Sequence, residues 1–268
     1  MNVRGSRKDN SSELQYNKIN SYFGVEIFNL EDITSISDVQ IIELKKLIYE
    51  YYFVVIKGSR VWTEKEQVDL TGKLGRIELP PIYSIPLTRI NQERKKKRLI
   101  KETGIQWHSD NSDKERPSFL SLFQMQKIPF NGTETFFVSL IDSYSELTND
   151  IVDRWSNYNV RYSSNAQHPM LWKHPYNGKS TIYFDFAFVS CIHDTSNENK
   201  EITVKLYNQE LDHLNNLLTH HPSHYTHKWE IGDMLIIDNY AISHRANFVL
   251  VDGDSRILLR TTTEGVYF

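Results

Sequence analysis

The C-terminal half of the chain is a series of short apolar runs separated by turn residues. Five runs are candidate strands: FLSLFQMQ, TETFFVSL, STIYFDFAFV, DMLIIDNY and RILLRTTT. Dipeptides that favour tight turns, Asn131-Gly132, Asn177-Gly178 and Asp252-Gly253, lie between some of them. Many short strands of this kind are typical of a barrel or a sandwich, so the pattern predicts a mainly β fold.

Helical segments precede and interrupt these strands. Residues 38–52, DVQIIELKKLIYEYY, have apolar side chains at helical spacing, and a short apolar strand, YFVVIKG, follows. A second helix is predicted in TEKEQVDLTGKLG, which opens with a capping-box pair, Thr63 and Glu66, and stops at Gly75. Two more are predicted in SYSELTNDIVDRW and in residues 200–218. We therefore expect helices that cover a β core from outside.

Composition limits the class of protein. A chain of 268 residues with 39% hydrophobic residues can bury one substantial core, and we expect a single domain over residues 19–268 after a flexible polar tail, residues 1–18. The net charge of −3 gives no electrostatic reason to expect nucleic acid as a partner. We expect no membrane span, no secretory signal and, with one cysteine, no intrachain disulfide, which favours a cytoplasmic protein. The oligomeric state stays open, a homo-oligomer included.

Three features have a structural as well as a functional interpretation. Cys191 lies in the apolar run FAFVSCI, where we expect a buried, inert thiol. The four histidines of LLTHHPSHYTHKW are numerous enough for zinc but lack cysteine partners, so structural or surface roles are expected. The basic run ERKKKR, residues 93–98, belongs to residues 76–106, which we expect to be a solvated loop. The alternative is a lid beside an active site.

The segment GIQWHSD places an imidazole and a carboxylate two residues apart. On a strand, His108 and Asp110 would point to the same face. His244, which follows the apolar run around Ile236, is the best candidate for a third ligand, while Asp238-Asn239 are expected to order the turn before it. Two histidines and one carboxylate form the ligand set of non-haem Fe(II) oxygenases. The H-x-D pair alone is a weak signal, because surface turns contain it too.

Further motifs occur in the order found in one known family. YFVVIKG, LTGKLG, WHSD, NGTETFFVS, KHPYNGKSTIYF, HKWEIGDMLIIDNYAISHR and SRILLRTTT together resemble the TauD/TfdA (taurine dioxygenase-like) family of Fe(II)/2-oxoglutarate-dependent oxygenases. The match runs from about Ser21 to the C-terminus. It implies a double-stranded β-helix core (jelly-roll, cupin-like) with flanking helices, forming one oxygenase domain.

The resemblance implies roles for the matching residues. His108, Asp110 and His244 match the three iron ligands. Arg256 matches the arginine that holds the distal carboxylate of 2-oxoglutarate, a task that suits a planar guanidinium, and Thr135 matches a threonine whose hydroxyl assists it.

Arg260 matches a second arginine, which tends to face the primary substrate or to support the first. The alternative for Arg260 is a structural, salt-bridged arginine.

The resemblance also implies the chemistry. Fe(II), 2-oxoglutarate and O2 would together oxidise an unactivated C–H bond of a small, anionic or amino-acid-derived metabolite, with release of succinate and CO2. Halogenating relatives lack the carboxylate at Asp110, so its presence favours hydroxylation, desaturation or oxidative cleavage. Glu78, Pro80 and Gly104 depart from the residues of taurine dioxygenases, which argues against taurine as the substrate.

Three alternatives to hydroxylation of a small molecule stay open. The first is desaturation or decarboxylative rearrangement in natural-product biosynthesis, as with isonitrile precursors. The second is a non-catalytic jelly-roll binding protein. The third is a protein or nucleic-acid hydroxylase that docks through ERKKKR.

Overall fold

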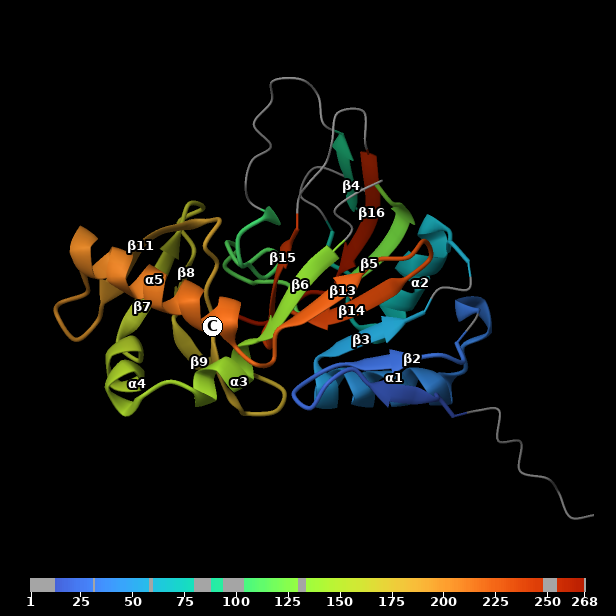
Figure 1. Cartoon of the computed structure of the whole chain (residues 1–268), viewed down its shortest axis with the longest axis horizontal. Coiled ribbons are helices and arrows are strands. Elements are labelled where there is room, and N and C mark those ends of the chain that lie inside the picture. The colour runs from blue at the N-terminus through green and yellow to red at the C-terminus, as the bar shows by residue number, and fades with distance from the viewer. Residues whose placement is uncertain are drawn as a thin grey trace, which may run out of the picture.

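The computed structural model describes residues 13–30, 32–57, 60–79, 88–93, 104–129, 134–247 and 255–267. Figure 1 shows two groups of elements: large sheet layers with α1 and α2, and smaller sheets with α3, α4 and α5. The strands of the first part are β1 (Tyr16–Lys18), β2 (Val25–Ile27), β3 (Phe53–Ile56), β4 (Thr88–Glu93), β5 (Leu120–Lys127), β6 (Glu134–Ser139), β13 (Tyr225–Lys228), β14 (Met234–Asp238), β15 (Ile242–Ala246) and β16 (Ser255–Thr262). Those of the second part are β7 (Tyr158–Tyr162), β8 (Gln167–Pro169), β9 (Leu171–Lys173), β10 (Ser180–Ile182), β11 (Val189–Asp194) and β12 (Lys200–Glu201). The helices are η2 (Ile33–Ser35), α1 (Asp38–Tyr51), α2 (Glu64–Leu74), α3 (Leu140–Ser145), α4 (Asn149–Trp155) and α5 (Val204–His220).

The largest sheet has seven strands in the order β1-β2-β3-β14-β5-β16-β4. Only β2 and β3 pair in parallel; the other neighbours are antiparallel. Strands distant in sequence are therefore neighbours in the sheet, as in a jelly roll.

Strand β3 explains why its sequence, FVVI, is apolar throughout. Successive side chains of a strand point to opposite faces. Val54 and Ile56 pack in the apolar cluster under α1 and α2, whereas Phe53 and Val55 pack in a second cluster on the other face. Because both faces of this central strand are buried, no polar residue alternates with the apolar ones.

A three-stranded sheet, β13-β6-β15, lies over the second face of the large sheet (Figure 1). One apolar cluster contains side chains of both sheets: Phe53, Val55, Phe123, Met125, Phe137, Leu235, Ile237, Ile242 and Leu258 among them. The two sheets therefore form a sandwich with a shared core. The mainly β fold and helical cover predicted from the sequence are confirmed.

The second part of the molecule holds a four-stranded sheet, β12-β11-β7-β8, and a hairpin of β9 and β10. Its core includes Trp155, Tyr158, Val160, Ile192 and Leu214, which come from α4, β7, β11 and α5. These apolar side chains alternate with more exposed residues along β7, as expected for a sheet with one buried face.

The helices predicted at residues 38–52 and 63–75 are confirmed as α1 and α2, and their ends lie within one residue of the prediction. Ser37 caps α1, and Thr63 caps α2 in the capping box with Glu66 that the sequence predicts. Gly75 follows the last residue of α2. Leu44 of α1 and Leu70 of α2 are buried, and both pack in the apolar core between these helices and the large sheet.

The predicted helix SYSELTNDIVDRW is instead two helices, α3 and α4. Thr148 has an extended backbone and begins α4 as its N-terminal cap residue, a position that threonine favours. The predicted helix at 200–218 likewise begins later. Lys200–Glu201 form β12, and Thr203 caps α5 with its side chain.

The predicted strand STIYFDFAFV is interrupted. Only Ser180–Ile182 belong to β10, and β11 begins at Val189. The carboxylate of Asp185 accepts hydrogen bonds from the backbone N–H groups of Ala187 and Phe188, at 2.6 and 3.3 Å. This local side-chain bonding replaces the strand ladder and turns the chain.

Two other expectations, on the extent of the polar tail and on the burial of Cys191, need correction. Tyr16–Lys18, placed in the polar tail, form β1 and pair with β2, and Leu14 just before them is buried. Cys191, expected to be buried, is only partly buried on β11. The basic run and most of the candidate lid, residues 80–87 and 94–103, lie outside the described residues, as do residues 1–12 of the tail.

Candidate metal and cosubstrate centre

The backbones of His108 and His244 are joined directly. His108 N–H donates to the His244 carbonyl at 3.0 Å, and His244 N–H donates to the His108 carbonyl at 2.9 Å. This isolated antiparallel bridge ties the WHSD segment to β15, and His108–Asp110 do not form a strand. A single bridge followed by a turn brings the side chains together instead.

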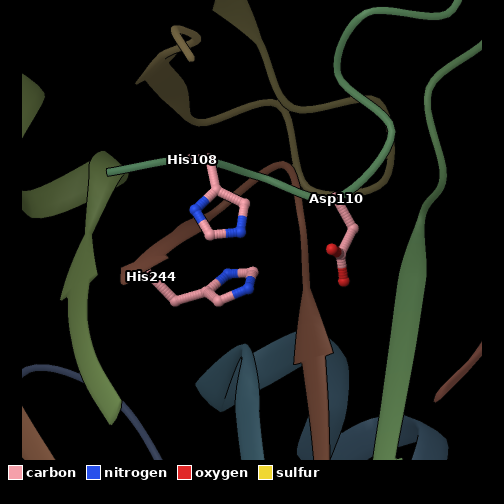
Figure 2. Close-up of side chains that lie close together, drawn as sticks. All are labelled: His108, Asp110 and His244. Atoms are coloured by element: carbon pink, nitrogen blue, oxygen red, sulfur yellow. The ribbon is translucent and has the colours of Figure 1, made fainter. Parts of the chain in front are cut away.

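The three predicted ligand side chains converge on one point (Figure 2). One ligand atom from each of His108, Asp110 and His244 lies within 4.8 Å of the others. Nδ1 of His108 lies 2.8 Å from the Gln106 carbonyl, which is the hydrogen bond of an Nδ1-protonated ring. Its Nε2 is then left with a lone pair for a metal.

Local electrostatics keep two of these groups in the forms that bind metals. Burial alone would raise the pKa of Asp110, but the Arg260 charge, the nearby imidazoles and the Ser121 hydroxyl lower it to about 2. Burial lowers the pKa of His244 to about 3, and the charges of His108, Arg260 and Arg256 act in the same direction. The site therefore presents a carboxylate and a neutral imidazole at neutral pH.

Asn239 positions Asp110 in a way that the sequence did not reveal. Its Oδ1 accepts from the Asp110 backbone N–H at 3.1 Å, and its Nδ2 donates to Ser121 Oγ at 2.9 Å. Ser121 in turn donates to Asp110 Oδ2 at 2.6 Å. All three residues are buried. The dipeptide Asp238-Asn239 before His244 is the sequence signal nearest to this role, but from the sequence it predicts only an ordered turn.

Asp238, the other member of that dipeptide, accepts from His174 Nε2 at 2.8 Å, and both side chains are fully buried. Asp238 also accepts from the Tyr240 backbone N–H. The expectation that this aspartate orders the turn before His244 is confirmed.

Arg256 is a buried cation on β16 beside Thr135. Its Nη2 lies 3.4 Å from Thr135 Oγ1, which also accepts from Trp229 Nε1 at 2.8 Å. Burial lowers the pKa of Arg256 to about 10, and its Nε has no hydrogen-bond partner in the described chain. Among the residues that the structure describes, no carboxylate pairs with this guanidinium. Because an unpaired buried charge is costly, this end of the site suits an anionic ligand.

Arg260 reaches the centre from the same strand. Its Nη1 forms an ion pair with Asp110 Oδ1, while its Nε is buried without a partner among the described residues. Its side chain remains 20% exposed. The structure thus contains the salt bridge that is the alternative interpretation of Arg260. The Nε–H of Arg260 remains without a partner among the described residues.

Glu78, one of the departures from taurine dioxygenases, is fully engaged. Its carboxylate accepts from Asn111, Lys114, Ser118 and Thr262. Such a carboxylate joins the loop after Asp110 to β16 and is not available to a substrate. Gly104 lies at the edge of the described chain, and Pro80 lies outside it.

The donor set fits the groups that the sequence implies. Two imidazoles and a carboxylate leave room for further ligands on a metal, as Fe(II) oxygenases require. The buried guanidinium of Arg256 suits a dicarboxylate bound to the same metal. These residues come from β15, β16 and the loop that carries His108 and Asp110, which the fold brings together.

Comparison with known families decides the identity of this arrangement. The model of the TauD, TfdA family (taurine catabolism dioxygenase) matches residues 14–262. The chain belongs to the TauD/TfdA family. The family predicted from the sequence is thereby confirmed, and the dioxygenase class predicted with it is the one that the description of the family names.

Two curated relatives of this TauD/TfdA protein differ in what their names describe. An alpha-ketoglutarate-dependent sulfonate dioxygenase of Saccharomyces cerevisiae is 26% identical over 89% of the chain, which spans 64% of the length of that relative. A 3-((Z)-2-isocyanoethenyl)-1H-indole synthase of Fischerella ambigua is 23% identical and is matched over 87% of its length by 84% of this chain.

Solved structures share the fold of this TauD/TfdA protein. A taurine dioxygenase from Burkholderia xenovorans superposes with a TM-score of 0.79 over 94% of this chain and 91% of its own, at 21% identity. The structure of AAD-2 with Mn(II) and N-oxalylglycine gives 0.83 over 95% and 98%, at 17% identity. These likenesses confirm the jelly-roll core. Among the helices that the structure describes, none combines the length and apolarity that a membrane crossing needs.

Proposed function

We propose that this protein is a 2-oxoglutarate-dependent oxygenase that oxidises a C–H bond of a small anionic or amino-acid-derived metabolite. His108, Asp110 and His244 would hold Fe(II), and Arg256 with Thr135 would bind the distal carboxylate of 2-oxoglutarate. The single observation that carries the proposal is the convergence of these three ligands beside a buried guanidinium whose Nε has no hydrogen-bond partner among the described residues. AAD-2, a neighbour in fold, binds N-oxalylglycine, which differs from 2-oxoglutarate by an N–H in place of a methylene.

Iron held by His108, Asp110 and His244 would supply, with 2-oxoglutarate and O2, the oxidising chemistry whose by-products are succinate and CO2. The chain's own residues orient and shield the reactants. The Gln106 carbonyl fixes the tautomer of His108, and Ser121 and Asn239 fix the carboxylate of Asp110. Trp229 holds the Thr135 hydroxyl beside Arg256. Phe123 and Phe137 pack beside the His244 ring and exclude water from that side.

Arg260 supports an anionic substrate. Its Nη1 is bound to Asp110, but its Nε has no partner in the described chain and its side chain is partly exposed. A carboxylate or sulfonate of the substrate would satisfy this donor next to the metal. Glu78, occupied by four hydrogen bonds, would not contribute.

A second candidate reaction stays within the same class. The Fischerella ambigua relative is named for a product with an isocyano group and a double bond, and the alignment covers most of that protein. Desaturation or decarboxylative rearrangement is therefore the alternative to hydroxylation. The two diverge after hydrogen abstraction, so product mass separates them: hydroxylation adds one oxygen atom and desaturation removes two hydrogen atoms.

Turnover of a panel of anionic metabolites with Fe(II), 2-oxoglutarate and O2 tests the proposal. We expect one substrate to raise succinate formation together with its own oxidation, and His108→Ala to abolish both. Arg260→Ala should raise KM for that substrate by about tenfold or more, because a charge-assisted hydrogen bond is lost. Succinate formation that is equal in wild type and His108→Ala would refute the proposed centre; an unchanged KM would refute only the role of Arg260.

A further inference from the structure

A second group of metal-ligating side chains lies outside the proposed iron centre. Cys191 and His193 are two residues apart on β11, and Glu201 on β12 is the cross-strand partner of His193. One ligand atom from each of the three lies within 4.8 Å of the others. Figure 1 shows β11 in the smaller-sheet part of the molecule, away from β15, which carries His244.

The backbone brings these three side chains to one face. Residues two apart on a strand point to the same side, and cross-strand partners do as well. Ile192, between Cys191 and His193, is fully buried in the core, so its neighbours point outward. The register of β11 against β7 shifts between Val189 and Cys191, and such a bulge re-aims the side chain that follows it.

The distances suit a zinc-sized ion. Cys191 Sγ and His193 Nε2 are 4.0 Å apart. Bond lengths of about 2.3 Å to sulfur and 2.0 Å to nitrogen at a tetrahedral angle place the two ligands about 3.5 Å apart. Nδ1 of His193 has no hydrogen-bond partner in the described chain, so the ring can turn by this small amount without breaking a hydrogen bond.

We propose that Cys191, His193 and Glu201 bind a divalent zinc-class cation through a thiolate, an imidazole and a carboxylate. Thiolate and imidazole are the ligands that such ions select, and three protein ligands leave the fourth position to water. No step of the proposed oxygenase reaction uses this group.

The charges around the thiol are consistent with a cation. Burial raises the pKa of Cys191, and the Glu201 carboxylate raises it further, whereas Arg161 lowers it. A metal bound here would displace the proton of the thiol, because a coordinating thiol is deprotonated. Arg161 donates to Asn165 Oδ1 at 2.8 Å, and so has a partner of its own.

Binding would fix the connection into α5. β12 contains only Lys200 and Glu201, and α5 begins at Val204. An ion held by Glu201 on one side and by β11 on the other would clamp this hairpin and the start of the helix. The proposed role is structural.

The single cysteine of the chain makes the test specific. Anaerobic titration of the reduced protein with Co²⁺ should produce a near-ultraviolet thiolate-to-cobalt charge-transfer band, which only Cys191 can supply. We expect the band to disappear in Cys191→Ser and to persist in His108→Ala, since the proposed iron centre contains no sulfur. His193→Ala and Glu201→Gln should each weaken Co²⁺ binding at least about tenfold, because loss of an outer-shell partner alone costs about 10–100-fold.

Zn²⁺ provides a second readout on the same variants. At a concentration about 100 times Kd, Zn²⁺ should raise the Tm of wild type by about 5 °C more than that of Cys191→Ser. Well-folded wild type without a thiolate band at saturating Co²⁺ would overturn the proposal. A band that His193→Ala and Glu201→Gln leave unchanged would do so too, because the ion would then bind the thiol alone.

Discussion

Asn239 contacts Asp110 by two routes, one through the backbone N–H and the other through Ser121. Its side chain is fully buried, and its Nδ2 also donates to the Phe119 carbonyl at 3.3 Å. The orientation of the carboxylate thus depends on a residue that is not itself a proposed ligand. Loss of such a hydrogen-bonding partner typically costs a metal site about 10–100-fold in affinity.

Asn239→Ala tests this positioning role. We expect Fe(II) affinity to fall about 10–100-fold, and the free energy of unfolding to fall by about 1–3 kcal/mol because buried groups lose their partners. Anaerobic Fe(II) titration and urea unfolding measure the two effects. Asn177→Ala, which removes a hydrogen bond to the Tyr52 hydroxyl, is the matched control. Equal Fe(II) affinity in Asn239→Ala and wild type would contradict the role of Asn239.

At the residue scale, the sequence predicted the side chains that carry chemistry better than those that hold them. His108, Asp110 and His244 stand in recognisable motifs, and the fold brings them together. Trp229 donates to Thr135 across 94 positions, a contact that depends on the pairing of β13 with β6. Periodicity reveals which face of a strand is buried, but not which strand lies beside it.

At the scale of elements, α2 is anchored at its first turn by charge as well as by capping. Glu66 accepts from the Thr63 backbone at 2.7 Å and pairs with Arg60 at 2.6 Å. The hydrogen bond from Arg60, followed by those from Thr63, lowers the pKa of Glu66 to about 2. The unfolded chain therefore binds a proton more readily than the folded one between about pH 2 and the ordinary value of 4.5.

The stability that Glu66 contributes should consequently depend on pH. A depressed carboxyl pKa stabilises the fold above about pH 4.5, and this contribution is lost as the pH falls toward about 2. We expect Glu66→Gln to lower the free energy of unfolding by roughly 0.5–1 kcal/mol at pH 7, within the range for exposed pairs, and by nothing near pH 2. Urea unfolding at several pH values measures this difference. A difference in the free energy of unfolding between wild type and Glu66→Gln that is equal at every pH would contradict this expectation. The difference between wild type and Arg60→Gln should show most of the same pH dependence.

Helices and strands were predicted correctly where the local sequence signals agreed. The prediction was wrong where a side chain forms hydrogen bonds with the backbone and interrupts a strand. The helical spacing of α1, and the capping box and Gly75 stop of α2, predicted the ends of these helices correctly. The apolar run at 180–189 predicts one strand. However, the Asp185 carboxylate accepts hydrogen bonds from the backbone N–H groups of Ala187 and Phe188, and the strand stops before it. Short strands such as β1, β8 and β9 contain too few residues for a period-2 pattern to appear.

At the scale of the whole molecule, the centre is shared between the two sheets of the sandwich. His244 and Thr135 belong to the three-stranded sheet, on β15 and β6. Arg256, Arg260 and Ser121 belong to the seven-stranded sheet, on β16 and β5. The proposed metal ligands and the buried guanidinium of Arg256 therefore meet only when the two sheets pack together. The sequence could name the members of this site, whereas the order of strands that unites them required the structure.

Anaerobic titration of the apoprotein with Fe(II) and 2-oxoglutarate tests the shared centre most directly. Chelation of iron by 2-oxoglutarate gives a weak visible charge-transfer band. We predict that wild type develops this band, that His108→Ala does not, and that Arg256→Ala needs at least about tenfold more 2-oxoglutarate, because the buried charge-assisted contact is lost. Arg76→Ala, at the surface, should behave as wild type. Folded wild type without the band, or Arg256→Ala with wild-type affinity, would contradict the centre described here.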